Sequence, residues 1–285
     1  MLGAITGDII GSWYEFRNYK AKNFEPLFHT GAKFTDDTVC TVAIADALVN
    51  GLDPATTLQR WGREYWSNGG WGQRFNLWLA EDDPKPYNSW GNGSAMRVGP
   101  AGLLATSITH AIELATQVTV ITHNHPEGLK AAQATAVAIW LARQRTGSEE
   151  IRQKLTERFG YRLDMMVDEI RPGYKFTEAS QDSVPQALVC ALEATDFEDA
   201  MRNAVSIGGD SDTIAAIAGS VAEARFGIPE EIAAKTWSYL PRDMRVVMTG
   251  LYQQGSGSVA VTKTNNTSNT TQAISPSSTY TRKEK

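Results

Sequence analysis

The chain is 285 residues long, contains 42% hydrophobic residues and carries a formal net charge of −5. This length and apolar content suffice for a sizeable core, whereas the negative charge argues against bulk nucleic-acid binding, which needs a basic surface. No stretch reaches the roughly 20 apolar residues that a membrane span requires. Asp8 interrupts the first apolar stretch, so a signal peptide is not expected. We expect a cytoplasmic, monomeric protein that does not bind membranes.

Helical signals recur along nearly the whole chain, and strand-like alternation never extends over more than a few residues. Asn50-Gly51 ends the first long apolar helix, and Asp53-Pro54 opens the next one. Helices are expected at residues 38–49, 54–66, 95–105, 109–122, 126–145, 148–159, 184–194, 196–206, 212–225, 229–238 and 242–253. The sequence therefore predicts an all-α fold, a single-domain orthogonal helical bundle.

Two segments lack this helical pattern. Residues 67–94 are rich in Gly, Asn, Pro and Trp, and a loop this long inside a compact domain is usually functional. Residues 254–285 are dominated by Gly, Ser, Thr and Asn and are poor in apolar residues, which is typical of a disordered tail. We therefore expect one helical domain at residues 1–253 and a disordered tail at 254–285.

Two acidic clusters lie far apart in the chain and nearly match in content. Residues 34–38 read Phe-Thr-Asp-Asp-Thr, and residues 208–213 read Gly-Gly-Asp-Ser-Asp-Thr. Such side chains are also ordinary helix caps, because their oxygens accept bonds from the first N–H groups of a helix. Together, however, the clusters favour one site for hard cations such as Mg²⁺, Ca²⁺ or Mn²⁺. Four carboxylates and two hydroxyls can hold two ions, which activate water for hydrolysis.

A third motif, at residues 7–15, reads Gly-Asp-Ile-Ile-Gly-Ser-Trp-Tyr-Glu. Its two glycines lie at helical spacing and permit close approach of another backbone. Glu15, taken alone, is a solvated residue at a helix end, but beside the two acidic clusters it strengthens the case for a metal site. Residues 90–93, Trp-Gly-Asn-Gly, fit a phosphate cradle, because glycines free backbone amides to face an anion. An ordinary Gly-Asn turn is the alternative there.

With these motifs in view, the chain resembles the ADP-ribosylglycohydrolase family, which includes dinitrogenase-reductase-activating and ADP-ribosylhydrolase enzymes. The resemblance covers roughly residues 1 to 250 and rests on five motifs in the family's order. These are GDIIGSWYE, FTDDTV, SWGNGSAMRVGP, THNHPEG and GGDSDTIAAIAG. Each motif is weak alone, and their combination and order are specific. The resemblance implies a dinuclear magnesium centre, with manganese as an alternative, in the middle of the helical bundle.

The resemblance also implies roles for individual residues. The family's metal ligands match Thr35, Asp36, Asp37, Asp210, Asp212 and Thr213. Its mobile glutamate near the metal pair matches Glu15, so the catalytic set is expected to be Glu15, Asp36 and Asp37. The loop that wraps the phosphates and ribose of ADP-ribose matches Ser89, Trp90, Gly91 and Asn92. A histidine that lines the same pocket matches His123. Some members carry an acid just before the Gly-Asn pair, where this chain reads Asn88-Ser89-Trp90.

These residues lead us to expect a magnesium-dependent hydrolase that removes ADP-ribose from a protein side chain or a small conjugate. One alternative is a non-catalytic module that binds ADP-ribose or another nucleotide with the same fold. A structural protein that reuses the fold would be expected to lose its metal-site carboxylates. A helical nucleotide pyrophosphatase would carry Glu-x-x-Glu motifs, which Glu149-Glu150 and Glu230-Glu231 do not supply.

Overall fold

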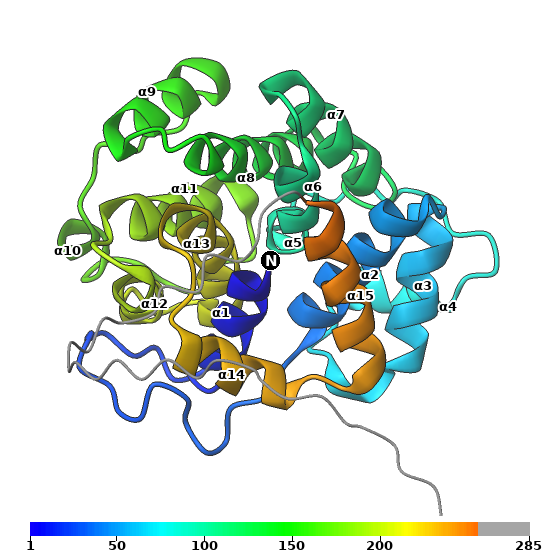
Figure 1. The fold of residues 1–285 in the computed structure, drawn as a ribbon, viewed down its shortest axis with the longest axis horizontal. Coiled ribbons are helices and arrows are strands. Elements are labelled where there is room, and N and C mark those ends of the chain that lie inside the picture. Colours follow the sequence, from blue (N-terminus) through cyan, green and yellow to red (C-terminus); the bar gives the residue numbers. More distant parts are fainter. Residues whose placement is uncertain (256–285) are drawn as a thin grey trace, which may run out of the picture.

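The computed structural model describes residues 1–255, which form a bundle of α-helices (Figure 1). Within those residues the only β feature is an isolated antiparallel bridge between Gly91 and Ala179. None of their helices is both long enough and apolar enough to cross a membrane. In chain order the helices are α1 (Leu2–Ser12), α2 (Asp36–Asn50), α3 (Pro54–Glu64), η1 (Trp66–Asn68), α4 (Gln73–Ala80), α5 (Gly93–Met96), α6 (Gly99–Leu104), α7 (Ile108–Thr119), α8 (Pro126–Arg143), α9 (Ser148–Phe159), α10 (Val167–Ile170), α11 (Ser180–Glu193), α12 (Phe197–Ser206), α13 (Ser211–Phe226), α14 (Glu230–Tyr239) and α15 (Arg242–Gln254).

The predicted all-α fold is confirmed, and most expected helices are present with boundaries that differ by a few residues. The predicted loop at 67–94 is wrong for residues 73–80, which form α4. Phe75, Trp78 and Leu79 of α4 are buried at the i, i+3, i+4 spacing of an apolar helix face. The predicted helix 95–105 is instead split into α5 and α6. Pro100 lies in the first turn of α6, where its missing N–H needs no acceptor, whereas in one continuous helix it could not donate to the carbonyl of Met96.

Helices α1 and α13 pack with their backbones in direct contact, near the middle of the bundle (Figure 1). A Cβ atom added to Gly3 would lie 2.2 Å from the carbonyl oxygen of Gly219, and one added to Gly7 would lie 2.0 Å from that of Ala215. Gly11 approaches Ser211 in the same way. The expected close approach at the glycines of residues 7–11 is thus confirmed. This contact sets the end of α1 beside the start of α13.

The start of α2 is tied to the middle of α1 by one buried carboxylate. Asp8 accepts hydrogen bonds from the backbone N–H and hydroxyl of Thr35, at 2.9 and 2.7 Å, and from both groups of Thr38. Burial raises the pKa of Asp8 above its usual value, and the four donors oppose this shift by favouring the charged carboxylate. The end of α1 and the beginnings of α2 and α13 therefore meet at one place in the fold.

Buried apolar side chains from most of the helices form one connected core around this junction. Both cysteines, Cys40 and Cys190, are buried within it as free thiols. The tail expected at 254–285 lies outside the described residues from 256 onward.

Candidate metal and nucleotide site

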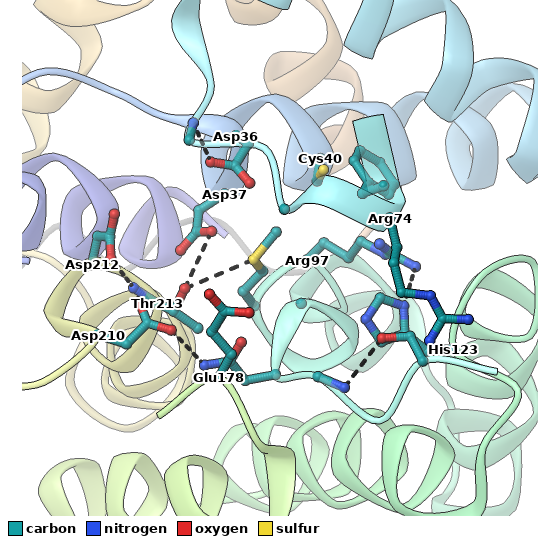
Figure 2. A pocket seen from close by; sticks show the side chains of 18 of the residues that line it. Asp36, Asp37, Cys40, Arg74, Arg97, His123, Glu178, Asp210, Asp212 and Thr213 are labelled. Carbon is teal, nitrogen blue, oxygen red and sulfur yellow. Dashed lines mark hydrogen bonds between the residues drawn. The ribbon is translucent and has the colours of Figure 1, made fainter. Parts of the chain in front are cut away.

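A pocket of about 310 Å³ opens where the three helix ends meet. Most of the residues expected at the site line this pocket, although they come from distant segments (Figure 2). The expected residues in its wall are Glu15, Asp36, Asp37, Ser89, Gly91, Asn92, His123, Asp210, Asp212 and Thr213. Thr35 and Trp90 are the two that do not line it.

Five carboxylates gather at one end of the pocket, and we call them the acid group: Glu15, Asp36, Asp37, Asp210 and Asp212. One carboxylate oxygen from each of Glu15, Asp210 and Asp212 lies within 4.8 Å of the other two. The Thr213 hydroxyl lies 3.5 Å from Asp37 Oδ1 and so joins the two acidic clusters of the sequence. The clusters, about 170 residues apart, thus face each other across one small space.

Burial and mutual repulsion raise the pKa values of the acid group. Burial is the largest cause for Glu15, whose pKa rises to about 7, and the nearby charge of Asp210 adds to it. Burial also raises the pKa of Asp36 to about 6, although Gly70 N–H donates to this carboxylate at 2.9 Å. The pKa values of Asp37 and Asp212 lie well above the usual range, mainly because of burial and then because of neighbouring acids.

The acid group fits a divalent cation. Buried carboxylates are normally paired or bound to metal, yet no Lys or Arg among residues 1–255 forms an ion pair with this group. Asp37 Oδ2 is buried and has no hydrogen-bond partner in the described part of the chain. Ligands that are all oxygen favour Mg²⁺ or Mn²⁺ over softer ions. A cation here would satisfy Asp37 and offset the repulsion among the acids.

Thr35 acts as the N-cap of α2, because its hydroxyl accepts the N–H of Asp37 at 3.4 Å. The capping interpretation of Thr-Asp-Asp is therefore confirmed at Thr35. The same hydroxyl donates its proton to Asp8 at 2.7 Å, which leaves an oxygen lone pair for another partner. Its predicted role as a metal ligand stays a prediction.

The glycine-rich loop after residue 88 reaches the acid group through Asn92. The Asn92 side-chain amide donates to Asp210 Oδ2 at 2.7 Å, and its backbone N–H donates to the carbonyl of Glu178 at 2.8 Å. Gly91 N–H faces the Ser89 hydroxyl at 3.2 Å. Trp90 is 47% exposed and does not line the pocket. The loop thus forms the side of the pocket, with Trp90 at its surface.

The end of the pocket away from the acid group is basic, and most of it was not expected from the sequence. Arg97 is buried, and one of its terminal nitrogens donates to the Thr122 hydroxyl at 2.5 Å and lies 3.5 Å from His123 Nδ1. Arg74 lies over the Tyr87 ring, 4.8 Å from its centroid. Burial first, then the two arginine charges, holds the pKa of His123 well below its usual value. We call Arg74, Arg97 and His123 the basic group (Figure 2).

The positive charges of the basic group are not balanced by any carboxylate of the described residues. Neither Arg74 nor Arg97 forms an ion pair within residues 1–255, and the Nε atom of Arg97 is buried without a hydrogen-bond partner there. A sequence signal for Arg97 existed, because it interrupts the apolar stretch Met96-Arg97-Val98 with a charge. Arg74 carried no such signal, since it lies in the helix that was taken for a loop.

Comparison with known proteins shows the family to which the chain is similar. The sequence profile of the ADP-ribosylglycohydrolase family matches residues 1–257. ADP-ribosylarginine hydrolase Tri1 of Pseudomonas putida is 28% identical, over 84% of this chain and 73% of its own. ADP-ribosylhydrolase ARH3 of Homo sapiens is 25% identical, over 81% of this chain and 85% of its own. An uncharacterised protein of Archaeoglobus fulgidus is 30% identical, over 48% of this chain and half of its own.

Similarity extends to three-dimensional structure. A solved structure described as an ADP-ribosylglycohydrolase-related protein complex superposes with a TM-score of 0.66 and 25% sequence identity. The match covers 89% of this chain and 97% of the other. Because the family profile spans nearly the whole chain and the fold agrees with it, this protein belongs to the ADP-ribosylglycohydrolase family, as its motifs predict.

Proposed function

We propose that this protein is a magnesium-dependent hydrolase that cleaves the ribosyl bond of ADP-ribosylated side chains or small ADP-ribose conjugates. The observation that carries the proposal is the polarity of the pocket. An acid group that fits divalent cations occupies one end, and arginines that form no ion pair within residues 1–255 occupy the other. ADP-ribose has a matching polarity, because its diphosphate is anionic and its terminal ribose presents hydroxyls.

In this proposal the basic group and the glycine-rich loop hold the diphosphate. Arginine recognises phosphate through paired, charge-assisted hydrogen bonds. Ser89, Gly91 and Asn92 supply polar groups along the same wall. His123 remains neutral, so it acts as a hydrogen-bonding side chain and adds no charge. Trp90 does not line the pocket, but its ring is exposed in the same loop, where it would stack on an adenine that extends beyond the pocket wall.

The acid group then serves the reacting end of the substrate. Asp36, Asp37, Asp210, Asp212 and the hydroxyls of Thr35 and Thr213 would hold two Mg²⁺ ions, or Mn²⁺ ions in their place. Bound ions supply Lewis-acid chemistry that orients ribose hydroxyls and lowers the pKa of water. Glu15 lies next to this cluster and accepts the proton of the attacking water. The remaining carboxylates favour the positive charge that develops on the ribose.

A binding module without turnover is the second candidate, since a diphosphate cradle alone would bind ADP-ribose. The presence of Glu15 within 4.8 Å of Asp210 and Asp212 favours the enzyme. The deciding experiment measures release of ADP-ribose from several ADP-ribosyl conjugates, with Mg²⁺, with Mn²⁺ and with chelator. Metal-dependent release from at least one conjugate is expected. Tight ADP-ribose binding without release from any conjugate would instead identify a binding module. The cytoplasmic location and the monomeric state stay predictions.

A further inference from the structure

We propose that Arg97 and Thr122 act as positioning residues for His123 and fix the tautomer of its ring that carries the proton on Nε2. His123 can then only donate a hydrogen bond into the pocket, which makes it a donor for an oxyanion. The inference rests on the proposed function and deepens it, because the oxyanion would be the diphosphate of ADP-ribose. Both positioning residues lie within motifs of the sequence, but neither was expected to act at the site.

Three buried side chains are joined in series by hydrogen bonds at the basic end of the pocket. A terminal nitrogen of Arg97 lies 2.5 Å from the hydroxyl oxygen of Thr122, and this oxygen lies 2.8 Å from Nδ1 of His123. Figure 2 shows the side chain of Arg97 beside the ring of His123. Apart from a 3.5 Å contact between the same Arg97 nitrogen and Nδ1, the side chains of Thr122 and His123 form no other hydrogen bond among residues 1–255.

The direction of each hydrogen bond follows from the chemistry of the groups. A guanidinium has donors only and keeps its charge, so the Thr122 oxygen accepts from Arg97. A hydroxyl has a single proton, and the only other side-chain partner of this hydroxyl is Nδ1 of His123. Nδ1 is therefore an acceptor and carries no proton. The Arg97 nitrogen enforces this as well, because a proton on Nδ1 would point toward another N–H group.

An imidazole whose Nδ1 is an acceptor is neutral and carries its proton on Nε2. Burial and the arginine charges lower the pKa of His123, which agrees with a neutral ring. Nε2 has no hydrogen-bond partner in the described part of the chain and faces the glycine-rich loop. Cβ atoms added to Gly91 and Gly93 would lie 3.7 and 3.4 Å from Nε2. Because neither position carries a side chain and His123 lines the pocket, the Nε2 proton is available to a ligand.

The tautomer decides which ligand atoms His123 can bind. With its proton on Nε2, the ring donates to a phosphate oxygen. In the opposite tautomer, a lone pair on Nε2 would face the same oxygen and repel it, and the ring would instead accept from a hydroxyl or amino group. Arg97 and Thr122 therefore convert a side chain with two possible roles into a donor. Arg97 in this way contributes to anion binding through His123 as well as by its own charge.

The first test observes the tautomer itself. In protein labelled with nitrogen-15, long-range correlation spectra of the imidazole rings distinguish a protonated ring nitrogen from an unprotonated one. His123→Leu removes one of the four histidine signals and so assigns it. We expect an unprotonated Nδ1 and a protonated Nε2 at neutral pH, both before and after ADP-ribose is added. A proton on Nδ1, alone or together with one on Nε2, would overturn the inference.

The second test asks whether the hydroxyl of Thr122 matters for binding. Thr122→Val keeps the shape of the side chain but leaves Nδ1 without its donor, so the tautomer with a proton on Nδ1 should become populated. The affinity for ADP-ribose, measured by calorimetry, should fall by about 10-fold, within the range for a hydrogen bond to a charged group. Thr122→Ser should restore both the tautomer and the affinity. Thr119→Val is the matched control, because the buried Thr119 hydroxyl has no hydrogen-bond partner among residues 1–255.

A double-mutant cycle shows whether Thr122 acts through His123. His123→Leu should itself weaken ADP-ribose binding by about 10-fold, and adding Thr122→Val should cause no further loss, because the side chain through which Thr122 acts is gone. Additive losses, or an unchanged affinity in Thr122→Val alone, would overturn the inference while the hydrolase proposal stands. If no ADP-ribosyl conjugate is cleaved, the hydrolase proposal fails, whereas the tautomer and the binding cycle need no turnover and still decide the inference.

Discussion

The two ends of the pocket are built in different ways. The acid group comes from helix ends, with Asp36 and Asp37 in the first turn of α2 and Asp212 in the first turn of α13. Helix N-termini carry partial positive charge, which reduces the cost of gathering carboxylates there. The basic group comes from three separate places: helix α4, the residue after α5, and the segment between α7 and α8.

Support for the two ends differs as well. The acid group is held by the glycine contact between α1 and α13 and by the four hydrogen bonds to Asp8. In the basic group, Arg97 is buried, whereas Arg74 is exposed on a short helix. A rigid arrangement suits groups that must share small ions, while a more adaptable one suffices for a diphosphate. Changes to the contacts that support the acid end should therefore affect folding, changes in the acid group itself should affect chemistry, and changes at the basic end should mainly affect affinity.

The largest effect is expected at the glycine contact. Gly7→Val would place side-chain atoms where the α13 backbone already lies, so the two helices must separate. We expect a loss of more than about 4 kcal/mol in the free energy of unfolding, above the usual range for a single substitution. Urea denaturation followed by circular dichroism measures this loss. Gly147→Val is the matched control, because no atom lies within 4 Å of an added Cβ there. Similar midpoints for both variants would mean that α1 and α13 are not packed this closely.

A substitution within the acid group should abolish metal binding and turnover but leave the fold intact. Asp37→Asn keeps the shape of the side chain and removes a negative charge from a buried cluster of acids. We expect loss of Mg²⁺ binding and at least a 10³-fold fall in turnover, because metal ligands act together. In chelator, thermal melting should not fall below that of the wild type, since a buried repulsion has been relieved. Melting curves with Mg²⁺ and with chelator test this. A stabilisation by Mg²⁺ as large as that of the wild type would exclude Asp37 as a ligand.

Nearly all residues of the acid end carry a signal in the sequence. Asp36 and Asp37 are adjacent and Asp210 and Asp212 are separated by one residue, so each pair could be found from its own local pattern. The helical spacing of Gly7 and Gly11 predicted the close contact that brings both pairs together. What could not be predicted is that Asp8 holds Thr35, because that contact joins two segments whose relative position only the fold determines.

The two arginines of the basic end escaped sequence reasoning for the same physical reason, whereas His123 was expected from the resemblance to the family. Arg74 and Arg97 are single residues in two segments, and no local spacing links them. Helix α4 was hidden because its two turns lie among glycines, asparagines and prolines that suggest a loop. Its buried face, formed by Phe75, Trp78 and Leu79, becomes an apolar face only when packed on the core. Phe176 and Glu178 likewise line the pocket although no local pattern in the sequence singles them out.

Glu15 tests whether the acid end does chemistry or only binds ions. Glu15→Gln keeps size and hydrogen bonding but cannot accept a proton. We expect turnover to fall by about 10²- to 10⁴-fold, the usual size of a general-base contribution, while ADP-ribose affinity stays within a few-fold. Calorimetry with ADP-ribose beside a product-release assay separates the two quantities. Equal losses in both would make Glu15 a ligand or a positioning residue, and unchanged values would leave it an ordinary helix-end residue.

The smallest effect is expected at the exposed arginine of the basic end. Arg74→Ala removes one of the two arginine charges there but leaves the buried Arg97 in place. The affinity for ADP-ribose should fall by about 10-fold, the lower end of the range for a hydrogen bond to a charged group. Turnover at saturating substrate should change by less than about 3-fold, because Arg74 lies away from the reacting ribose. Arg162→Ala, which removes an exposed arginine paired with Asp164, controls for the change in net charge. The loss at Arg74 should shrink as salt is raised, since an exposed charge is screened by ions. A fall in turnover as large as that of Glu15→Gln would show that the two ends of the pocket are not separate in function.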